Sequence, residues 1–317
     1  MSHPPSPDGR AGPEPPAAAA IAARARSGVL CAGSILVDEG KSIDRYPAVE
    51  RLAVIESVSR STGGAAINMA IDLRRLGAPF PVALMGAIGD DPNGAWILEA
   101  CDRHAIDATA VERLPGVVTA FTDVMVERDG GRRTFFHHVG AHAEWAGAGD
   151  AIARCSARIL HAGAPGLFDR MDAPDGAGGN GWSRLLERAR SAGIHTNLEM
   201  ATLEPARNRE VVGPCLPHLD SIVVNELEAG SLTGIDAVVD GPDGPMPWER
   251  LEAMATGLLE QGVRRLAVIH TPGGAVAARP DGQVVRQGSV RVPREEVRST
   301  DRKSTRLNSS HTDISRM

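Results

Sequence analysis

Polar residues directly after short apolar runs are the first candidates for chemistry, because open α/β sheets bind ligands at the carboxyl ends of their strands. Asp38 follows the apolar run at the start of "GSILVD", and a carboxylate there can accept hydrogen bonds from a polyol. In "STGGAAIN", Gly63 and Gly64 allow backbone N–H groups to approach a ligand at a helix N-terminus, and Asn68 lies in the first turn. The alternatives are a solvated loop acid for Asp38 and a flexible loop before a core helix for the glycines.

Two further stretches suit phosphate chemistry. In "NELE", Asn225 begins a predicted helix and Glu228 lies one turn later on the same face. An amide and a carboxylate so placed can orient magnesium-bound water, although an N-cap with an acid in the first turn explains the pair equally simply. In "HTPGG", the backbone of Gly273 and Gly274 can cradle a phosphate or form a plain turn between strands.

Three other motifs match catalytic or binding patterns in an unsuitable context. Residues 176–181, "GAGGNG", fit GxGxxG, but no strand precedes them, and the chain has no GxxxxGK[ST] motif. His137, His138 and His142 suggest a metal site, yet adjacent strand residues point to opposite faces.

"GAGDAIA", residues 147–153, raises the possibility that Asp150 is a catalytic base at the start of a helix. This match is weighed below, once its position among the other motifs is known.

The elements that position these residues alternate along the chain. Strands are expected at 29–34, 81–89, 157–163, 194–199, 221–225 and 265–270, and helices at 65–77, 94–105, 182–193, 226–234 and 248–262. This alternation predicts an α/β fold, with a mostly parallel sheet covered on both faces by helices. Residues 119–140 instead carry two β-rich runs around Asp129-Gly130-Gly131, which indicates a hairpin that projects from the sheet.

Composition narrows the functional class. The chain has 317 residues, 42% hydrophobic and 23% charged, with a formal charge of -6 that argues against nucleic-acid binding. Its four cysteines form no CxxC pair, and no apolar run is long enough to span a bilayer, so we expect a cytoplasmic protein without membrane partners. The Pro/Ala-rich residues 1–27 are expected to be a disordered leader.

The ordered set of motifs resembles the PfkB (ribokinase-like) family of carbohydrate kinases over about residues 28–300. The matching stretches, in the family's order, are "GSILVD", "GGAAIN", "GAIGDDPNG", "RRTFFHHVGAHA", "HTNLE", "VVNELEAGSLTG" and "VIHTPGGAVA". The resemblance implies a doubly wound α/β domain with a small β lid, at about residues 118–140, over a sugar. It also implies ATP and Mg2+ as cofactors, and a possible homodimer through the lid.

Site residues follow from the resemblance position by position. Asp38, Gly63, Gly64 and Asn68 match the sugar-binding positions of the family. Asn225 and Glu228 match its N-x-x-E motif for magnesium and phosphate, and Glu199 is a looser match to an acid near the phosphates. Thr271 and Gly273 match the nucleotide-side loop, with no residue expected to bind the metal directly. His142 replaces the asparagine of the common "GANA", which leaves the sugar specificity open.

The decisive family motif is a Gly-Ala-Gly-Asp after "HTPGG", whose N–H groups form an anion hole for the transferring phosphoryl group and whose Asp deprotonates the sugar hydroxyl. No such motif follows Thr300, and Asp150 has the right letters in the wrong place, so we expect no catalytic base in this chain. The hypothesis for residues 301–317 is a non-native tail joined to a C-terminally truncated kinase domain. The expected function is ATP-dependent phosphorylation of a sugar hydroxyl, with this chain nearly inactive because it lacks the motif; the alternatives are a non-catalytic sugar or nucleoside sensor and a nucleoside kinase.

Overall fold

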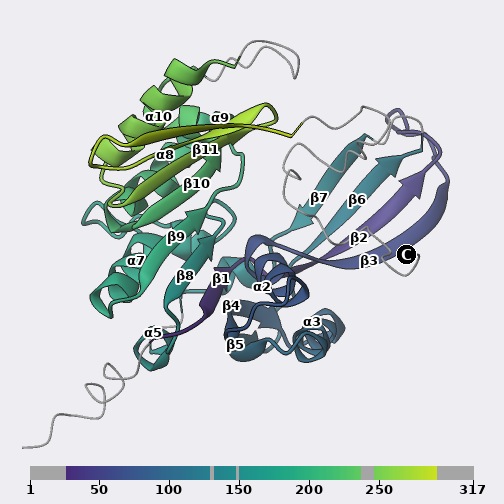
Figure 1. Ribbon diagram of the computed structural model, residues 1–317. Helices are drawn as coiled ribbons and strands as arrows, with labels where there is room; N and C mark the ends of the chain where they lie inside the picture. Colours follow the sequence, from purple (N-terminus) through teal and green to yellow (C-terminus); the bar gives the residue numbers. More distant parts are fainter. Residues whose placement is uncertain (1–25, 129–131, 148–149, 237–245, 291–317) are drawn as a thin grey trace, which may run out of the picture.

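Two sheets organise the part of the chain that the structure describes (Figure 1). The computed structural model describes residues 26–128, 132–147, 150–236 and 246–290. Within these ranges, a nine-stranded sheet has the order β13-β12-β11-β10-β9-β8-β1-β4-β5, and a separate four-stranded sheet has the order β3-β2-β6-β7. Residues 1–25 of the expected leader and the tail 301–317 lie outside the described residues.

The large sheet is parallel from β5 to β11 and ends in two antiparallel strands, β12 and β13. Its order reverses around β1, which pairs with β4 on one side and β8 on the other. The alternating pattern predicted the parallel sheet, and the family resemblance implied its doubly wound arrangement. The strands are β1 (Val29–Gly33), β4 (Val82–Gly89), β5 (Asp107–Leu114), β8 (Ile159–Gly163), β9 (His195–Glu199), β10 (Ser221–Asn225), β11 (Leu266–Thr271), β12 (Gly274–Ala278) and β13 (Val284–Gly288).

Helices cover the two faces of this sheet in different regions. The helices are α2 (Ala65–Arg75), α3 (Pro92–Arg103), α4 (Ala141–Glu144), α5 (Ala151–Arg154), α6 (Asp169–Asp172), α7 (Gly181–Ser191), α8 (Pro205–Val212), the 3-10 helix η1 (Gly213–His218), α9 (Glu226–Thr233) and α10 (Trp248–Glu260). Helix α2 packs on β1 and β4 and α3 on β4 and β5, whereas α7, α9 and α10 pack on β9 to β12.

Alternate side chains of β1 belong to two separate hydrophobic cores. Leu30 and Ala32 belong to the core that lies under α7 to α10, and Val29 and Cys31 belong to the core under α2. All five residues of β1 are buried, as expected for a central parallel strand covered on both faces. The strand is therefore a fixed support for the segment that leaves its carboxyl end.

The second sheet, here called the lid sheet, consists of β2 (Leu36–Ile43), β3 (Ile55–Gly63), β6 (Phe121–Glu127) and β7 (Arg133–His138). It stands to one side of the large sheet in Figure 1. Strands β6 and β7 are antiparallel, which confirms the predicted hairpin, although its expected turn at 129–131 lies outside the described residues. We did not expect β2 and β3, so the placement of Asp38 in a loop was wrong: Asp38 lies within β2.

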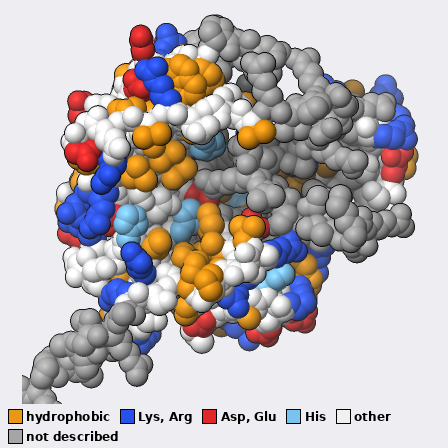
Figure 2. All heavy atoms as spheres, in the orientation of Figure 1, with side chains coloured by type: hydrophobic (Ala, Val, Ile, Leu, Met, Phe, Trp, Pro, Cys, Tyr) orange, Lys and Arg blue, Asp and Glu red, His pale blue; other side chains and the backbone are white. Residues whose placement is uncertain are grey.

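One face of the large sheet is covered by helices only in part. Alternate residues of β10 and β11 are buried under α9 and α10, whereas Val223 and Val268 on the opposite face are only half-buried. Figure 2 shows hydrophobic and histidine side chains on this side of the molecule. Among the described residues, no helix covers this face of β9 to β11. None of the described helices has the length and apolar character needed to cross a bilayer.

Candidate functional site

A cavity of about 270 Å³ lies on one face of the lid sheet. Strand register explains its lining, because Asp38, Ser61 and Thr122 are paired across three strands and so share a face. The volume is near the lower end of the range for small-molecule sites, roughly 300–1,000 Å³. Its lining residues are Asp38, Gly40, Ser42, Ser57, Ser59, Ser61, Thr62, Asn68, Val124, Val126, Arg133 and Phe135.

Asp38 is the one carboxylate that lines this cavity. Burial raises the pKa of its carboxyl from 3.8 to about 6, while a hydrogen bond from Thr122 and the charge of Arg133 act in the opposite direction. The Thr122 hydroxyl also contacts Nδ1 of His137 at 3.0 Å. A partly buried carboxylate of this kind gains a strong hydrogen bond when a substrate hydroxyl donates to it.

Gly63 makes room for that carboxylate. A Cβ atom at this position would overlap the Oδ2 atom of Asp38 and the Cδ1 atom of Leu36. Gly64, the N-cap of α2, has φ +97°, a conformation that favours glycine, and a Cβ there would overlap the Ser34 carbonyl oxygen. The absence of a Cβ atom at both glycines therefore allows the close packing at the junction of β3 and α2.

Asn68 lies one turn into α2 and also lines the cavity. The Thr62 hydroxyl donates to its Oδ1 atom at 3.2 Å, which fixes the orientation of the amide. At the start of the helix, Ser34 Oγ accepts from the Ala65 N–H at 2.7 Å, so this N–H already has a protein partner. In this helix it is therefore the Asn68 amide that lines the cavity.

The second group of predicted residues lies at the carboxyl ends of β9, β10 and β11. Asn225 and Glu228 form a capping box: Asn225 Oδ1 accepts from the Glu228 N–H at 2.8 Å, and Glu228 Oε2 accepts from the Asn225 N–H at 3.1 Å. The Thr202 hydroxyl donates to Glu228 Oε1 at 2.9 Å. Glu228 is only 5% exposed, so the interpretation as a helix cap holds locally.

The donor set around Glu228 fits Mg2+ only as an indirect ligand. The described residues contain no group of three His, Cys, Asp or Glu side chains that could hold a metal ion. Mg2+ usually keeps several waters and uses one or two protein carboxylates together with substrate phosphates. The amide oxygen of Asn225 and the carboxylate oxygens of Glu228 suit that role through bound water.

The nucleotide-side candidates form a compact turn. The Thr271 hydroxyl, 4% exposed, accepts from the N–H groups of Gly273 at 3.1 Å and Gly274 at 3.2 Å. These N–H groups therefore have a protein partner in this conformation, which favours the turn between β11 and β12. Glu199 ends β9, and its Oε2 atom lies 3.3 Å from His161 Nε2.

The structure thus brings the predicted residues into two groups along one edge of the large sheet. The lid sheet continues from the carboxyl end of β1, and the other group occupies the carboxyl ends of β9 to β11, which run parallel to β1 through β8. This is the edge at which open α/β sheets bind ligands.

Asp150 lies at the opposite edge. It precedes the short helix α5, its side chain is 88% exposed, and Arg154 lies 4.0 Å from its carboxylate. Ala151 and Arg154 line a hollow together with Val29 and Val82, the first residues of β1 and β4. Residues 148–149 of the motif lie outside the described residues.

The GxGxxG match of residues 176–181 also lacks a nucleotide-binding context. It leads from α6 into α7, where Asn180 caps the helix by accepting from the Ser183 N–H at 2.9 Å. The element directly before it is the helix α6 and not a strand, as the sequence indicated.

The rings of His137 and His142 lie with their centroids 6.2 Å apart, but the main contacts of the three histidines are with other residues. His137 contacts Thr122, whereas the ring of His138 stacks on Phe121 with centroids 5.1 Å apart. His142 is fully buried, its ring stacks on Phe168, and its Nε2 atom lies 3.0 Å from the backbone nitrogen of Ile35. Burial lowers the pKa of His142 to about 3. This residue supports the segment between β1 and Asp38 and does not line the cavity.

Several residues on the cavity face of the lid sheet were missed by the sequence reasoning, and all of them except Thr122 line the cavity itself. Thr122, Arg133 and the row Ser57, Ser59 and Ser61 face the cavity side of the lid sheet. The period-2 spacing of the three serines was an available strand signal. It is a weak one, because the stretch has no alternating apolar face.

Comparisons with known proteins agree with this architecture. An ATP-dependent ribose-1-phosphate kinase of Halopiger xanaduensis is 32% identical over 102 residues, 32% of this chain and 34% of that protein. Fructokinase-1 of Oryza sativa subsp. japonica is 29% identical over 212 residues, 62% of each chain. The chain therefore spans about a third and about three fifths of these relatives' lengths.

The ribokinase structure of Arabidopsis thaliana, complexed with ribose and ATP, matches with a TM-score of 0.66 at 19% identity, over 84% of this chain and 78% of that chain. This confirms the ribokinase-like fold. The model of the pfkB family of carbohydrate kinases matches residues 29–301. The chain belongs to the pfkB carbohydrate kinase family.

Proposed function

We propose that this protein phosphorylates a sugar hydroxyl with ATP. The observation that carries the proposal is the lid-sheet cavity with Asp38 and Asn68, at the same sheet edge as the oxygen-rich ends of β9 to β11. Membership of a carbohydrate kinase family and the ribose and ATP bound by the structurally similar Arabidopsis protein support it.

Each site residue has a role in this proposal. Asp38 accepts a hydrogen bond from a sugar hydroxyl, Asn68 donates and accepts at the next one, and Gly63 and Gly64 leave space for both. Asn225 and Glu228 orient water around Mg2+, which supplies positive charge at the transferring phosphate groups. Glu199 lies near the phosphates, and the turn containing Thr271 and Gly273 faces the nucleotide.

The transfer step itself needs a base and an anion hole, which we do not assign to any residue. The sequence after Thr271 contains no Gly-Ala-Gly-Asp. We infer that the 317-residue chain binds sugar but transfers phosphate weakly.

The test combines calorimetry with an ADP-release assay. In the binding experiment, monosaccharides and a nucleoside are titrated into the chain and into Asp38→Asn. In the turnover experiment, ADP release from MgATP is measured for the chain and for the product of the source gene, resequenced across codons 299–303. Asp38-dependent sugar binding, with sugar-stimulated ADP release by that product, is the expected result. Sugar binding without ADP release by either protein would support the sensor instead, and preference for the nucleoside would support a nucleoside kinase.

We also propose that two copies pair through their lid sheets. Val58 and Phe136 are 65% and 50% exposed, and both lie on the face opposite the cavity. Light scattering of the purified chain should give the mass of a dimer, which Val58→Asp converts to a monomer. A monomer at micromolar concentration in the unchanged chain would contradict the pairing.

A further inference from the structure

The cavity has two chemically different ends. Register places Asp38, Ser61 and Thr122 in one row across the lid sheet, and Ser42, Ser57 and Arg133 in another row four residues further along the strands. Four residues of a strand span roughly 13 Å. Gly40 lies in the row between them and lines the cavity without a side chain.

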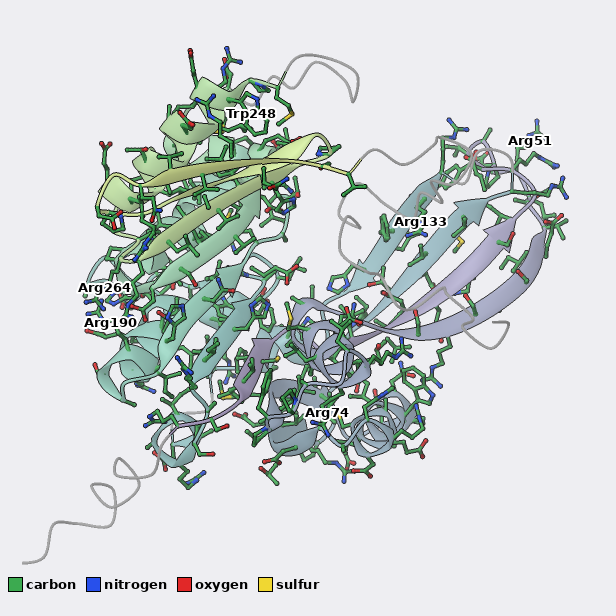
Figure 3. The ribbon with its side chains drawn as sticks, in the orientation of Figure 1. Arg51, Arg74, Arg133, Arg190, Trp248 and Arg264 are labelled. Carbon is green, nitrogen blue, oxygen red and sulfur yellow. The ribbon has the colours of Figure 1, made fainter. Side chains whose placement is uncertain are left out.

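The far row carries a positive charge. Arg133 lies on β7, and Figure 3 shows it inward of the lid tip, where Arg51 lies. Its charge attracts Asp38, but the two side chains are not in ion-pair contact. A neutral sugar offers such a cation only weak hydrogen bonds.

Arg133 also differs from the arginines of comparable burial. Five arginines of the described ranges are half-buried, and four of them donate hydrogen bonds to carbonyl or carboxylate oxygens: Arg26, Arg74, Arg190 and Arg207. Within those same ranges, Arg133 donates to no protein oxygen. Its five N–H donors therefore remain available to a ligand in the cavity.

The neighbouring side chains suit an anion. Ser42, Ser57 and Ser59 add hydroxyl donors on the same face, and Val124 and Phe135 supply apolar walls. A guanidinium with nearby hydroxyls is the donor set that binds phosphate or carboxylate oxygens in a fork-like geometry.

We propose that the substrate is a monosaccharide that carries an anionic group, phosphate or carboxylate, bound by Arg133 at the far row while its hydroxyls meet Asp38 and Asn68. This inference rests on the proposed sugar kinase function and names its substrate class. The anionic group occupies the end of the cavity away from Asp38, where repulsion from that carboxylate is smallest. Arg133 is then the residue that separates acidic from neutral sugars.

The test is calorimetric binding, which does not depend on turnover. Ribose, ribose 5-phosphate and ribonate are titrated into the full chain, Arg133→Gln, Arg133→Lys and the control Arg132→Gln. Arg132 is the neighbouring arginine, 79% exposed and paired with Glu127 at 2.7 Å, so its loss leaves the cavity unchanged.

The unchanged chain should bind at least one anionic sugar about ten- to a hundredfold more tightly than ribose, which is the strength of a charge-assisted hydrogen bond. Arg133→Gln should lose that preference, Arg133→Lys should keep part of it, and Arg132→Gln should keep all of it. Added salt should weaken binding of the anionic sugars only. Binding of ribose 5-phosphate alone identifies phosphate as the group, and binding of both acids identifies the shared anion chemistry.

Two outcomes would overturn the inference in distinguishable ways. Equal or tighter binding of ribose, or an unchanged preference in Arg133→Gln, refutes the anionic substrate and leaves the sugar kinase function standing. Absence of binding by all three sugars refutes both. Melting temperatures of the variants identify any loss of binding that comes from unfolding.

Discussion

Replacing Asp38 by Asn should stabilise the protein while it weakens sugar binding. The carboxyl is partly buried on the cavity face of the lid sheet, and this burial raises its pKa from 3.8 to about 6. The folded state therefore holds the proton more tightly than the unfolded state. Ionised Asp38 costs folding free energy fully above about pH 6 and almost nothing below about pH 4.

The size of the effect follows from the shift. One pKa unit corresponds to about 1.4 kcal/mol, so the cost is about 3 kcal/mol at pH 8 and about 1 kcal/mol at pH 4.5. Asparagine carries no charge at either pH, and its Oδ1 atom still accepts from Thr122. The stability of Asp38→Asn relative to the unchanged chain should thus rise by about 2 kcal/mol between pH 4.5 and pH 8.

The assay is urea unfolding of both proteins at the two pH values, paired with sugar calorimetry at pH 8. Other titrating groups are common to both proteins and cancel in the difference. We expect sugar affinity to fall at least about tenfold in Asp38→Asn because the charge-assisted hydrogen bond is lost. A stability difference that does not change with pH would refute the reasoning, since it would mean that Asp38 is solvated in the folded protein.

Three other substitutions test separate parts of the site. In Gly63→Ala, the new Cβ would overlap the Asp38 carboxylate and should displace it. Calorimetry should show sugar affinity reduced about tenfold, and urea unfolding should show stability reduced by about 1–3 kcal/mol. Unchanged affinity would contradict the packing of β3 against β2. Glu228→Gln should lose one of the two carboxylate oxygens that accept hydrogen bonds, which should lower the free energy of unfolding by about 1–2 kcal/mol. The Mg2+ concentration needed for ATP binding should rise. An unaltered Mg2+ requirement would restrict Glu228 to its capping role. Asp150→Asn should change stability by less than about 0.5 kcal/mol and leave any sugar-stimulated ADP release unaltered. The reason is that the Asp150 side chain is 88% exposed at the opposite sheet edge. Loss of ADP release in this variant would make Asp150 a catalytic residue.

The alternation of strands and helices in the large sheet could be predicted because each element carries a regular apolar pattern. In α10, the apolar pattern predicted one stripe of five residues, of which Leu251, Met254, Ala255 and Leu258 are buried and Leu259 is half-buried. The same reasoning found the β6–β7 hairpin from its β-rich runs. Apolar burial on one face is what makes such elements visible in a sequence.

Strands β2 and β3 could not be recognised in that way. Residues 36–43, "LVDEGKSI", have no alternating apolar face: Asp38, Gly40 and Ser42 line the polar cavity, and Lys41 on the opposite face pairs with Glu39 and Asp123. Residues 55–63 are mostly exposed and carry serines on the cavity side. The site residues Thr122 and Arg133 were missed for a related reason: their importance depends on register with Asp38 and Ser42, which the sequence of one strand does not contain.

The most direct test of the central claim is sugar-stimulated ADP release from MgATP by the product of the source gene, resequenced across codons 299–303. We expect ADP release to require both a monosaccharide and an intact Asp38. ADP release that no monosaccharide stimulates, or that persists unchanged in Asp38→Asn, would contradict the proposed sugar kinase function.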